Sequence, residues 1–454
     1  MKVASITQEN IESQSIPPNE AIFQKIHTPG KITKKRDIHI WAIFFFLIYV
    51  VILIKFVTIK QLDNNILFAG YSIAVSLYII SRFALAYFYN PKPLDFEGVD
   101  EYEPTISFGV PAKNEGENIK ETILRIAASD YPKNKFDIIA VNDGSTDNTL
   151  LEMYAAKEEA RTMGIHVEVI DWQDNRGKRE GMAECVKRSS KELIFFIDSD
   201  SFVEPDAARK VVKYFSHPKI GAVAGHAYVA NAETNILTKM QAVRYYVAFK
   251  AYKAAEALFG AVTCCSGCCS AYRRSYLLPF LNAWENQRFL GVKCTYGDDR
   301  SLTNYMLYYG YDAIFAPDVI AHTFVPDTFG VFMRQQLRWK KSWTRESLVA
   351  GTFMWRKNII MSISFYLGVI LPLLAPIIVA RAFIWYPIMR DRLPIYYVLG
   401  LVLMAVIYGL YYYVYTKDRK WIYGVAFATF YTLVMIWQLP YAILKIRDAK
   451  WGTR

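Results

Sequence analysis

Four short groups of residues in this chain carry side chains that could do chemistry, and they follow one another in a fixed order. The groups are Asp143-Gly144-Ser145, Asp198-Ser199-Asp200, Gly297-Asp298-Asp299-Arg300 and Gln335-Gln336-Leu337-Arg338-Trp339. Their carboxylates can bind a divalent metal ion or accept a proton, and their cationic and aromatic side chains can hold phosphate oxygens or a flat apolar ligand. Each group alone is common in proteins, so their order and their setting decide what they indicate.

The triplet Asp198-Ser199-Asp200 directly follows the apolar run 193–197, which predicts a buried strand. Two carboxylates one residue apart can share a hard divalent cation such as Mn²⁺ or Mg²⁺. That ion would neutralise a diphosphate and allow it to leave. The position at a strand end favours this interpretation of Asp198 and Asp200 over a chance match.

Asp143 and the pair Lys178-Arg179 could serve the same donor molecule. Asp143 follows another apolar run, and in a nucleotide-sugar enzyme it would accept hydrogen bonds from the uracil or the ribose. The alternative is an ordinary turn or helix cap. Lys178 and Arg179 offer positive charge to a diphosphate, and a solvated basic loop fits the sequence equally well.

Asp298 and Asp299 form a second acidic centre, separate in sequence from the first. Transfer of a sugar with inversion requires a base that takes the proton of the acceptor hydroxyl on the face opposite the departing diphosphate. We predict that Asp299 is this base and that Asp298 supports it. The alternative is a helix start at which acidic residues stabilise the first turn.

Gln335, Arg338 and Trp339 are three and four residues apart, so on a helix they share one face. Arg338 could pair with diphosphate oxygens, and Trp339 offers an apolar face and an N–H group to a sugar ring. The basic and aromatic residues that follow are also typical of a helix lying on anionic lipid. The two interpretations are compatible if the product enters the membrane.

Apolar patterning between residues 91 and 358 predicts the elements that position these residues. Short apolar runs predict strands buried on both faces, and amphipathic stretches between them predict helices. The runs are 106–110, 138–141, 167–170 and 193–197, and the helical stretches are 118–128 and 149–163. This alternation predicts an α/β fold with a Rossmann-like, mostly parallel sheet, which binds ligands at the carboxyl ends of its strands.

Membrane-length apolar sequence lies on both sides of this domain. We predict two spanning helices in the segment 38–90 and two in the segment 359–454, at 40–57, 67–89, 360–386 and 395–415. The run 421–443 has basic flanks on both sides and contains Pro440, which favours a re-entrant or interfacial segment over a fifth crossing. Residues 1–37 are polar and lack the apolar run of a signal peptide, which predicts a disordered cytosolic tail.

The composition agrees with a chain that is partly embedded in a membrane, because 53% of its residues are hydrophobic and 15% are aromatic. The formal charge is +11, and much of it flanks the apolar segments, as at the cytoplasmic edges of membrane proteins. The sequence has no helix-turn-helix or zinc-finger pattern, so nucleic acid is not expected as a partner. Cys264, Cys265, Cys268 and Cys269 are expected to be reduced thiols packed under the site rather than a zinc or redox centre.

The ordered motifs resemble those of the processive, inverting family-2 glycosyltransferases, which include cellulose, chitin and hyaluronan synthases. The resemblance covers residues 106–454 and is strongest to hyaluronan synthases. Further motifs that carry it are Cys265-Ser266-Gly267, Tyr272-Arg273-Arg274, Arg338-Trp339-Lys340-Lys341-Ser342 and Trp451-Gly452-Thr453-Arg454. It implies a cytosolic GT-A glycosyltransferase domain between transmembrane helices of the plasma membrane, with the residues 335–339 on an interfacial helix.

The resemblance also implies roles for individual residues. Asp200 would carry most of the metal binding, Asp143 would contact uridine, and Arg338 would hold the diphosphate of a UDP-sugar. The acceptor sugar would be held by Cys265, Gln335 and Trp339, with Asp299 as the base. Trp451, Thr453 and Arg454 would belong to a loop that closes over bound nucleotide from the cytosolic side, which favours the re-entrant interpretation of 421–443, since a fifth crossing would place that loop outside.

The leading hypothesis is a synthase that adds sugars alternately from UDP-GlcNAc and UDP-GlcA and extrudes the growing polysaccharide through the lipid bilayer. A chitin-like synthase would use UDP-GlcNAc alone, and the Cys-Ser-Gly-Cys-Cys run at 265–269 also resembles rhizobial chitooligosaccharide synthases. A third hypothesis is a single-transfer enzyme that glycosylates a lipid, which would not need a platform such as 335–339 to hold a polymer. The sequence indicates no oligomeric state.

Overall fold

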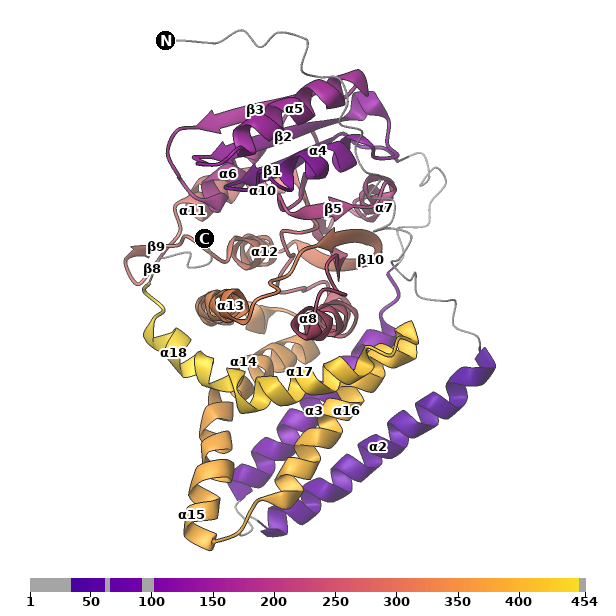
Figure 1. Cartoon of the computed structure of the whole chain (residues 1–454), viewed down its shortest axis with the longest axis vertical. Coiled ribbons are helices and arrows are strands. Elements are labelled where there is room, and N and C mark those ends of the chain that lie inside the picture. Colours follow the sequence, from indigo (N-terminus) through magenta and orange to yellow (C-terminus); the bar gives the residue numbers. More distant parts are fainter. Residues whose placement is uncertain (1–33, 62–65, 92–101, 449–454) are drawn as a thin grey trace.

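The computed structural model describes residues 34–61, 66–91 and 102–448 of the 454. An α/β domain lies at one end of the molecule and a group of long helices at the other (Figure 1). The chain passes from the first two long helices into this domain and then returns to the long helices. Both membrane-length parts of the sequence therefore lie on the same side of the domain.

One eight-stranded sheet forms the centre of the domain, with the strand order β3-β2-β1-β4-β7-β6-β10-β5. The strands are β1 (Ile106–Ala112), β2 (Phe136–Asp143), β3 (Val167–Trp172), β4 (Leu193–Phe196), β5 (Ser201–Val203), β6 (Ile220–Val229), β7 (Ser270–Arg273) and β10 (Asp312–Thr323). β1 to β4 pair in parallel, and so do β6 and β10. β7 is antiparallel to both β4 and β6, and β5 is antiparallel to β10. The sheet is mostly parallel, as predicted.

The two faces of the sheet pack against different helices, because successive residues of a strand point to opposite faces. In β4, Phe195 belongs to the apolar cluster that contains residues of α4, α5 and α7, whereas Phe196 belongs to the cluster with α6, α11 and α12. The helices are α4 (Ile119–Ala127), α5 (Thr149–Thr162), α6 (Lys178–Arg188), α7 (Ala207–Tyr214), α11 (Leu281–Glu285) and α12 (Asp298–Tyr308). This double cover confirms the predicted fold class.

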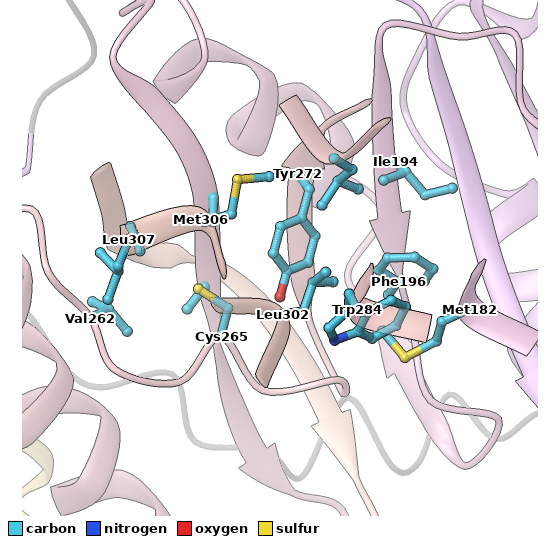
Figure 2. Packing of buried hydrophobic residues seen from close by; sticks show 14 of the residues in the cluster. Met182, Ile194, Phe196, Val262, Cys265, Tyr272, Trp284, Leu302, Met306 and Leu307 are labelled. Atoms are coloured by element: carbon cyan, nitrogen blue, oxygen red, sulfur yellow. The ribbon is translucent and has the colours of Figure 1, made fainter. Parts of the chain in front are cut away.

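The second of these clusters lies directly behind the predicted site. Figure 2 shows Trp284 beside Met182 and Phe196, and Cys265 among apolar side chains of α12. Trp284 and Cys265 have no exposed surface. The apolar packing of this cluster therefore fixes α6 and α12, the two helices whose first residues carry predicted site side chains.

Long apolar helices form the other part of the molecule. They are α2 (Lys34–Gln61), α3 (Ile66–Phe88), α14 (Ile359–Ala380) and α16 (Ile395–Thr416). The short helix α15 (Tyr386–Arg390) ends the segment that begins with α14. In the described part of the chain, three segments are long and apolar enough to cross a membrane: Gly70–Phe88, Ile359–Arg390 and Ile395–Thr416. The described apolar part of α2, Ala42–Thr58, is shorter, so the predicted crossing by α2 stays a prediction.

The last apolar segment is bent. α17 (Trp421–Leu433) is followed, after a break, by the short helical stretch that includes α18 (Gln438–Leu444), and the two parts meet at 45°. Figure 1 shows both helices on the domain side of the long helices, and α17 packs closely on α16. α17 packs against α8 (Ile236–Val247), and α18 packs against α13 (Phe329–Gly351). The bend fits a re-entrant segment or a broken span.

Candidate active site

Three of the predicted site residues come together at the edge of the sheet where strands end and helices begin. Asp198 follows β4, Lys178 is the first residue of α6, and Asp299 is the second residue of α12. In a doubly wound sheet this edge is the usual place for a ligand, because the strand ends and helix starts open a crevice there. The structure brings the three charged side chains around one glycine.

That glycine is Gly267, in the loop before β7. Its backbone N–H donates a hydrogen bond to Asp299 Oδ2 at 2.9 Å. A Cβ atom on Gly267 would lie 2.8 Å from Asp198 Oδ1, 3.0 Å from Asp299 Oδ1 and 3.1 Å from Lys178 Nζ. A larger residue would displace these groups, so the close approach requires glycine. The sequence signal for it is the Cys-Ser-Gly run, which locates the loop but not its neighbours.

Acidic groups outnumber cations in this cluster. Lys178 forms an ion pair with Asp198, and although burial disfavours its charge, Asp198 and Asp299 raise its pKa. Burial, and then the charge of Asp198, raises the pKa of Asp200 to about 6. Burial also raises the pKa of Asp299, and the charge of Lys178 opposes this rise. The cluster therefore holds more negative charge than Lys178 alone balances.

A hard divalent cation fits this donor set, because the carboxylates offer oxygen ligands only. The raised pKa of Asp200 shows that more positive charge would stabilise its ionised form. In the described residues, no three His, Cys, Asp or Glu side chains are grouped as a complete metal site. Asp198 and Asp200 fit instead a Mg²⁺-type site of one or two carboxylates, in which phosphate oxygens of a substrate complete the coordination.

Arg179 has a different place from its neighbour Lys178. Its side chain has no exposed surface, and its Nε donates to Asp298 Oδ1 at 2.8 Å. Its Nη1 donates to Gln287 Oε1 at 2.7 Å and to the carbonyl oxygen of Trp284 at 3.0 Å. The structure therefore corrects the expectation that both cations face a diphosphate: Arg179 fixes Asp298 from within the core, and only Lys178 faces the acidic cluster.

Buried hydrogen bonds also connect α12 to α13. Glu346 has no exposed surface and accepts hydrogen bonds from Arg345 Nε at 2.7 Å and Asn304 Nδ2 at 3.1 Å. Gly297, with φ of +78°, packs so closely on α13 that an added Cβ would lie 2.0 Å from Ser342 Oγ. These contacts tie the start of α12, which carries Asp299, to the helix that carries Arg338 and Trp339.

Asp143 lies at the end of β2 and is almost completely buried. Its Oδ1 accepts a hydrogen bond from the backbone N–H of Arg176 at 2.6 Å, and its Oδ2 accepts one from Gly177 at 3.0 Å. Asp143 therefore shapes the loop that leads into Lys178. Direct contact of Asp143 with uridine stays a prediction.

Arg338 lies beside the acidic cluster. Burial lowers its pKa, whereas the charges of Asp298 and Asp299 raise it. An arginine near a site for a metal ion and a diphosphate can balance the remaining phosphate charge. Pairing of Arg338 with a diphosphate stays a prediction.

Trp339 is half-buried and packs against α8. The Tyr245 ring lies 6.3 Å from the Trp339 ring between centroids, at an angle of 52°, and the guanidinium carbon of Arg244 lies 5.0 Å from the Trp339 centroid. Gln335, one turn earlier on α13, accepts a hydrogen bond from Gln336 at 3.4 Å. Sequence reasoning did not find Arg244 or Tyr245, because nothing in the pattern of α8 points to α13.

The cysteine-rich loop packs under the site. Cys265, Cys268 and Cys269 are buried, and burial raises the pKa of Cys265 to about 12, so its thiol stays protonated. The backbone N–H of Cys265 donates to Thr303 Oγ1 of α12 at 2.9 Å. The thiols therefore pack among apolar side chains, and contact of Cys265 with the acceptor sugar stays a prediction.

The chain reaches the site region again near its carboxyl end. Lys341 Nζ lies 3.3 Å from Asp448 Oδ2, and the Tyr296 hydroxyl donates to the backbone carbonyl of Asp448 at 3.1 Å. The predicted closing loop with Trp451, Thr453 and Arg454 lies outside the described residues. Asp448, the last described residue before this loop, is held by Lys341 of α13 and by Tyr296, just before Asp298.

Comparison with known families finds matches over most of the chain. The family described as glycosyltransferase-like family 2 matches residues 104–342, and the family described as chitin synthase matches residues 291–454. An N-acetylglucosaminyltransferase of Azorhizobium caulinodans is 32% identical over 358 residues, which are 77% of this chain and 87% of that protein. A hyaluronan synthase of Streptococcus pyogenes is 27% identical over 393 residues, which are 85% of this chain and 90% of that protein.

Comparison with solved structures shows the fold. A mannosyltransferase from Pyrobaculum calidifontis, in complex with GDP-Man and Mn²⁺, superposes with a TM-score of 0.58 at 20% sequence identity. The match covers 81% of this chain and 99% of the mannosyltransferase. The chain therefore shares its architecture with a glycosyltransferase.

Proposed function

This chain belongs to glycosyltransferase-like family 2, and we propose that it is a processive, membrane-embedded polysaccharide synthase. In this proposal it transfers sugars with inversion, alternately from UDP-GlcNAc and UDP-GlcA as a hyaluronan synthase does, and extrudes the growing chain. The relatives named hyaluronan synthase and N-acetylglucosaminyltransferase support this class of reaction. One observation carries it: Lys178, Asp198 and Asp299 meet around Gly267 at the ligand-binding edge of the sheet.

The residues of this cluster divide the reaction between them. Asp299 takes the proton of the acceptor hydroxyl, and its raised pKa brings it closer to the working pH that suits a general base. Lys178, which pairs with Asp198, and Arg338, which senses the charges of Asp298 and Asp299, hold the diphosphate. When bound by Asp198 and Asp200, Mn²⁺ or Mg²⁺ supplies positive charge to the departing diphosphate. The Mn²⁺ bound by the structural neighbour supports this cofactor.

The acceptor side of the site is formed by α13. Trp339 stacks against the acceptor sugar, and Gln335 lies on the same helix face one turn earlier. Cys265 acts from below through packing. A platform of this kind holds a polymer between additions, which a single-transfer enzyme does not need.

The proposal includes an arrangement of the helices in the membrane. α2, α3, the α14–α15 segment and α16 cross the plasma membrane, and α17 with α18 forms a re-entrant or interfacial segment on the cytosolic side. The catalytic domain is then cytosolic, where UDP-sugars are available. Residues 451–454 follow the cytosolic anchor at Asp448 and close over bound nucleotide.

A second candidate is a synthase that uses UDP-GlcNAc alone. The Azorhizobium caulinodans relative and the chitin synthase match over residues 291–454 favour it. It shares the site chemistry and differs only in donor choice and product.

Incubation of membranes with each UDP-sugar singly and in pairs tests the proposal. Hyaluronan synthesis predicts a polymer only with UDP-GlcNAc and UDP-GlcA together, and that polymer is digested by hyaluronidase. A polymer from UDP-GlcNAc alone that chitinase digests would establish the second candidate. Transfer of a single sugar to lipid, without polymer, would contradict both.

A further inference from the structure

Arg244 of α8 places a guanidinium beside Trp339 that the reaction described above does not use. Its central carbon lies 5.0 Å from the centroid of the Trp339 ring and 5.4 Å from the centroid of the Phe427 ring. Trp339 belongs to α13 and Phe427 to α17. Arg244 therefore lies between the acceptor platform and the bent apolar segment next to the membrane helices.

The charge of Arg244 is not balanced by the part of the protein that the structure describes. No carboxylate there forms an ion pair with it, and its Nη1 is buried without a hydrogen-bond partner. Lys340, on the same helix as Trp339, responds to this charge: burial and then Arg244 lower its pKa to about 7. A polar group that is buried without a partner costs free energy unless a ligand compensates it.

Stacking alone does not account for this residue. An arginine between two aromatic rings gains some attraction from the ring faces through cation–π contacts. An apolar side chain could also join α8, α13 and α17 without leaving a buried N–H group unpaired. The charged, planar group is therefore suited to a ligand that brings negative charge to Trp339.

We propose that Arg244 binds the carboxylate of a uronic acid unit in the polymer held on Trp339. This inference rests on the proposed polysaccharide synthase and names the class of chain that its acceptor path takes: anionic rather than neutral. A guanidinium pairs with a carboxylate through two parallel hydrogen bonds. The apolar faces of Trp339 and Phe427 exclude water from that pair and strengthen it.

The selectivity follows from the alternation of the polymer. A chain of N-acetylglucosamine and glucuronic acid carries a carboxylate on every second unit. As the chain advances by one sugar at a time, a carboxylate therefore reaches Arg244 after every second addition. A chain of N-acetylglucosamine alone carries none. Arg244 would then be a specificity-determining residue, since it contacts the product and not the reacting atoms.

The test compares two reactions of purified protein in lipid nanodiscs. The first is release of UDP from UDP-GlcNAc alone, and the second is incorporation of radiolabelled glucuronic acid from UDP-GlcA in the presence of UDP-GlcNAc. We expect Arg244→Gln to lower the ratio of the second rate to the first about 10-fold or more, because a hydrogen bond to a charged group contributes about 1.5–3 kcal/mol. Arg244→Lys keeps the charge but not the planar group, so its ratio should lie between those of the wild-type protein and Arg244→Gln.

Arg334→Gln is the matched control, because Arg334 is an exposed arginine of the same interfacial region, on α13. It should change the ratio less than 2-fold. An equal loss in both reactions of Arg244→Gln would make Arg244 a positioning residue for Trp339 and overturn the inference. If Arg244→Gln does not fold, Arg244→Lys decides the question. The inference would be overturned if Arg244→Lys had the same ratio of the two rates as the wild-type protein and if that ratio changed with salt concentration as it does in the wild-type protein.

The outcomes separate this inference from the proposed function. A wild-type protein that incorporates no glucuronic acid but makes a chitinase-sensitive polymer would overturn both the proposed use of UDP-GlcNAc with UDP-GlcA and the role of Arg244. A wild-type protein that makes the mixed polymer, with the same ratio in Arg244→Gln, would overturn the role of Arg244 alone.

Discussion

Asp298 and Asp299 are neighbours at the start of α12, yet their surroundings differ. Asp298 is 2% exposed and is paired with the buried guanidinium of Arg179. Asp299 faces Asp198 and Lys178, and burial raises its pKa. The backbone N–H of Gly267 donates a hydrogen bond to Oδ2 of Asp299, and the other oxygen, Oδ1, has no such bond to Gly267.

The difference teaches which carboxylate performs chemistry. A charge that is buried and fully paired holds its surroundings in place, and changing its protonation would break that pair. A charge whose pKa is perturbed in a ligand-binding crevice is instead a candidate for proton transfer. By this criterion Asp299 is the candidate for the base that we propose, and Asp298 is the candidate for a residue that positions it.

The largest effect is expected for Asp299→Asn. It removes the base but not a ligand for the nucleotide, so turnover should fall by about 10³-fold while UDP affinity changes less than about 3-fold. Radiolabelled sugar transfer and calorimetric UDP binding measure the two quantities. A loss of UDP affinity as large as the loss of turnover would move Asp299 to the donor side.

Arg179→Met should affect stability instead. It leaves Asp298 as an unpaired buried charge, which destabilises a protein by about 3–5 kcal/mol. We expect the denaturation midpoint of the purified protein to fall, with UDP affinity of the folded fraction nearly unchanged. A stable Arg179→Met protein with more than 10-fold weaker UDP binding would restore Arg179 as a donor ligand.

A moderate effect is expected for Gly267→Ala. The added Cβ would lie within 2.8–3.1 Å of Asp198, Lys178 and Asp299, so the cluster must open. Both donor affinity and turnover should fall, by about 10-fold each, because even a small misplacement of catalytic groups slows a reaction strongly. Gly330→Ala is the control, since its Cβ would meet only Arg334, at 3.7 Å. Normal activity of Gly267→Ala would show that the cluster is looser than its contacts indicate.

The first part of the sheet and the acidic side of the site could be predicted from sequence, because both depend on local patterns. The apolar run before Asp198 fixes a strand end, and in a parallel sheet such ends meet at one edge. The antiparallel β7 could not be predicted, since it has only four residues and pairs with strands distant in sequence. The close approach at Gly267 depends on that strand.

The separate roles of Lys178 and Arg179 could not be predicted either. The two residues are adjacent at a helix start, where consecutive side chains point about 100° apart. One therefore faces the crevice and the other the core, and the sequence does not say which. The partner that decides it, Asp298, is 119 residues away.

The smallest effect is expected at the root of the carboxyl-terminal segment, where Lys341 meets Asp448. The Lys341 side chain is 5% exposed, but that of Asp448 is 41% exposed, so water screens the pair and it contributes about 1 kcal/mol or less. Lys341→Met should therefore slow polymer synthesis only about 2- to 5-fold, because the Tyr296 hydroxyl still holds the Asp448 carbonyl. Lys219→Met, which breaks a pair of the same 3.3 Å length with Asp312 at the start of β10, should leave synthesis unchanged. Deletion of 451–454 should cost much more than Lys341→Met if the closing loop carries the function and Lys341 only anchors its root. Equal losses in the two variants would show that the anchor and the loop act as one unit.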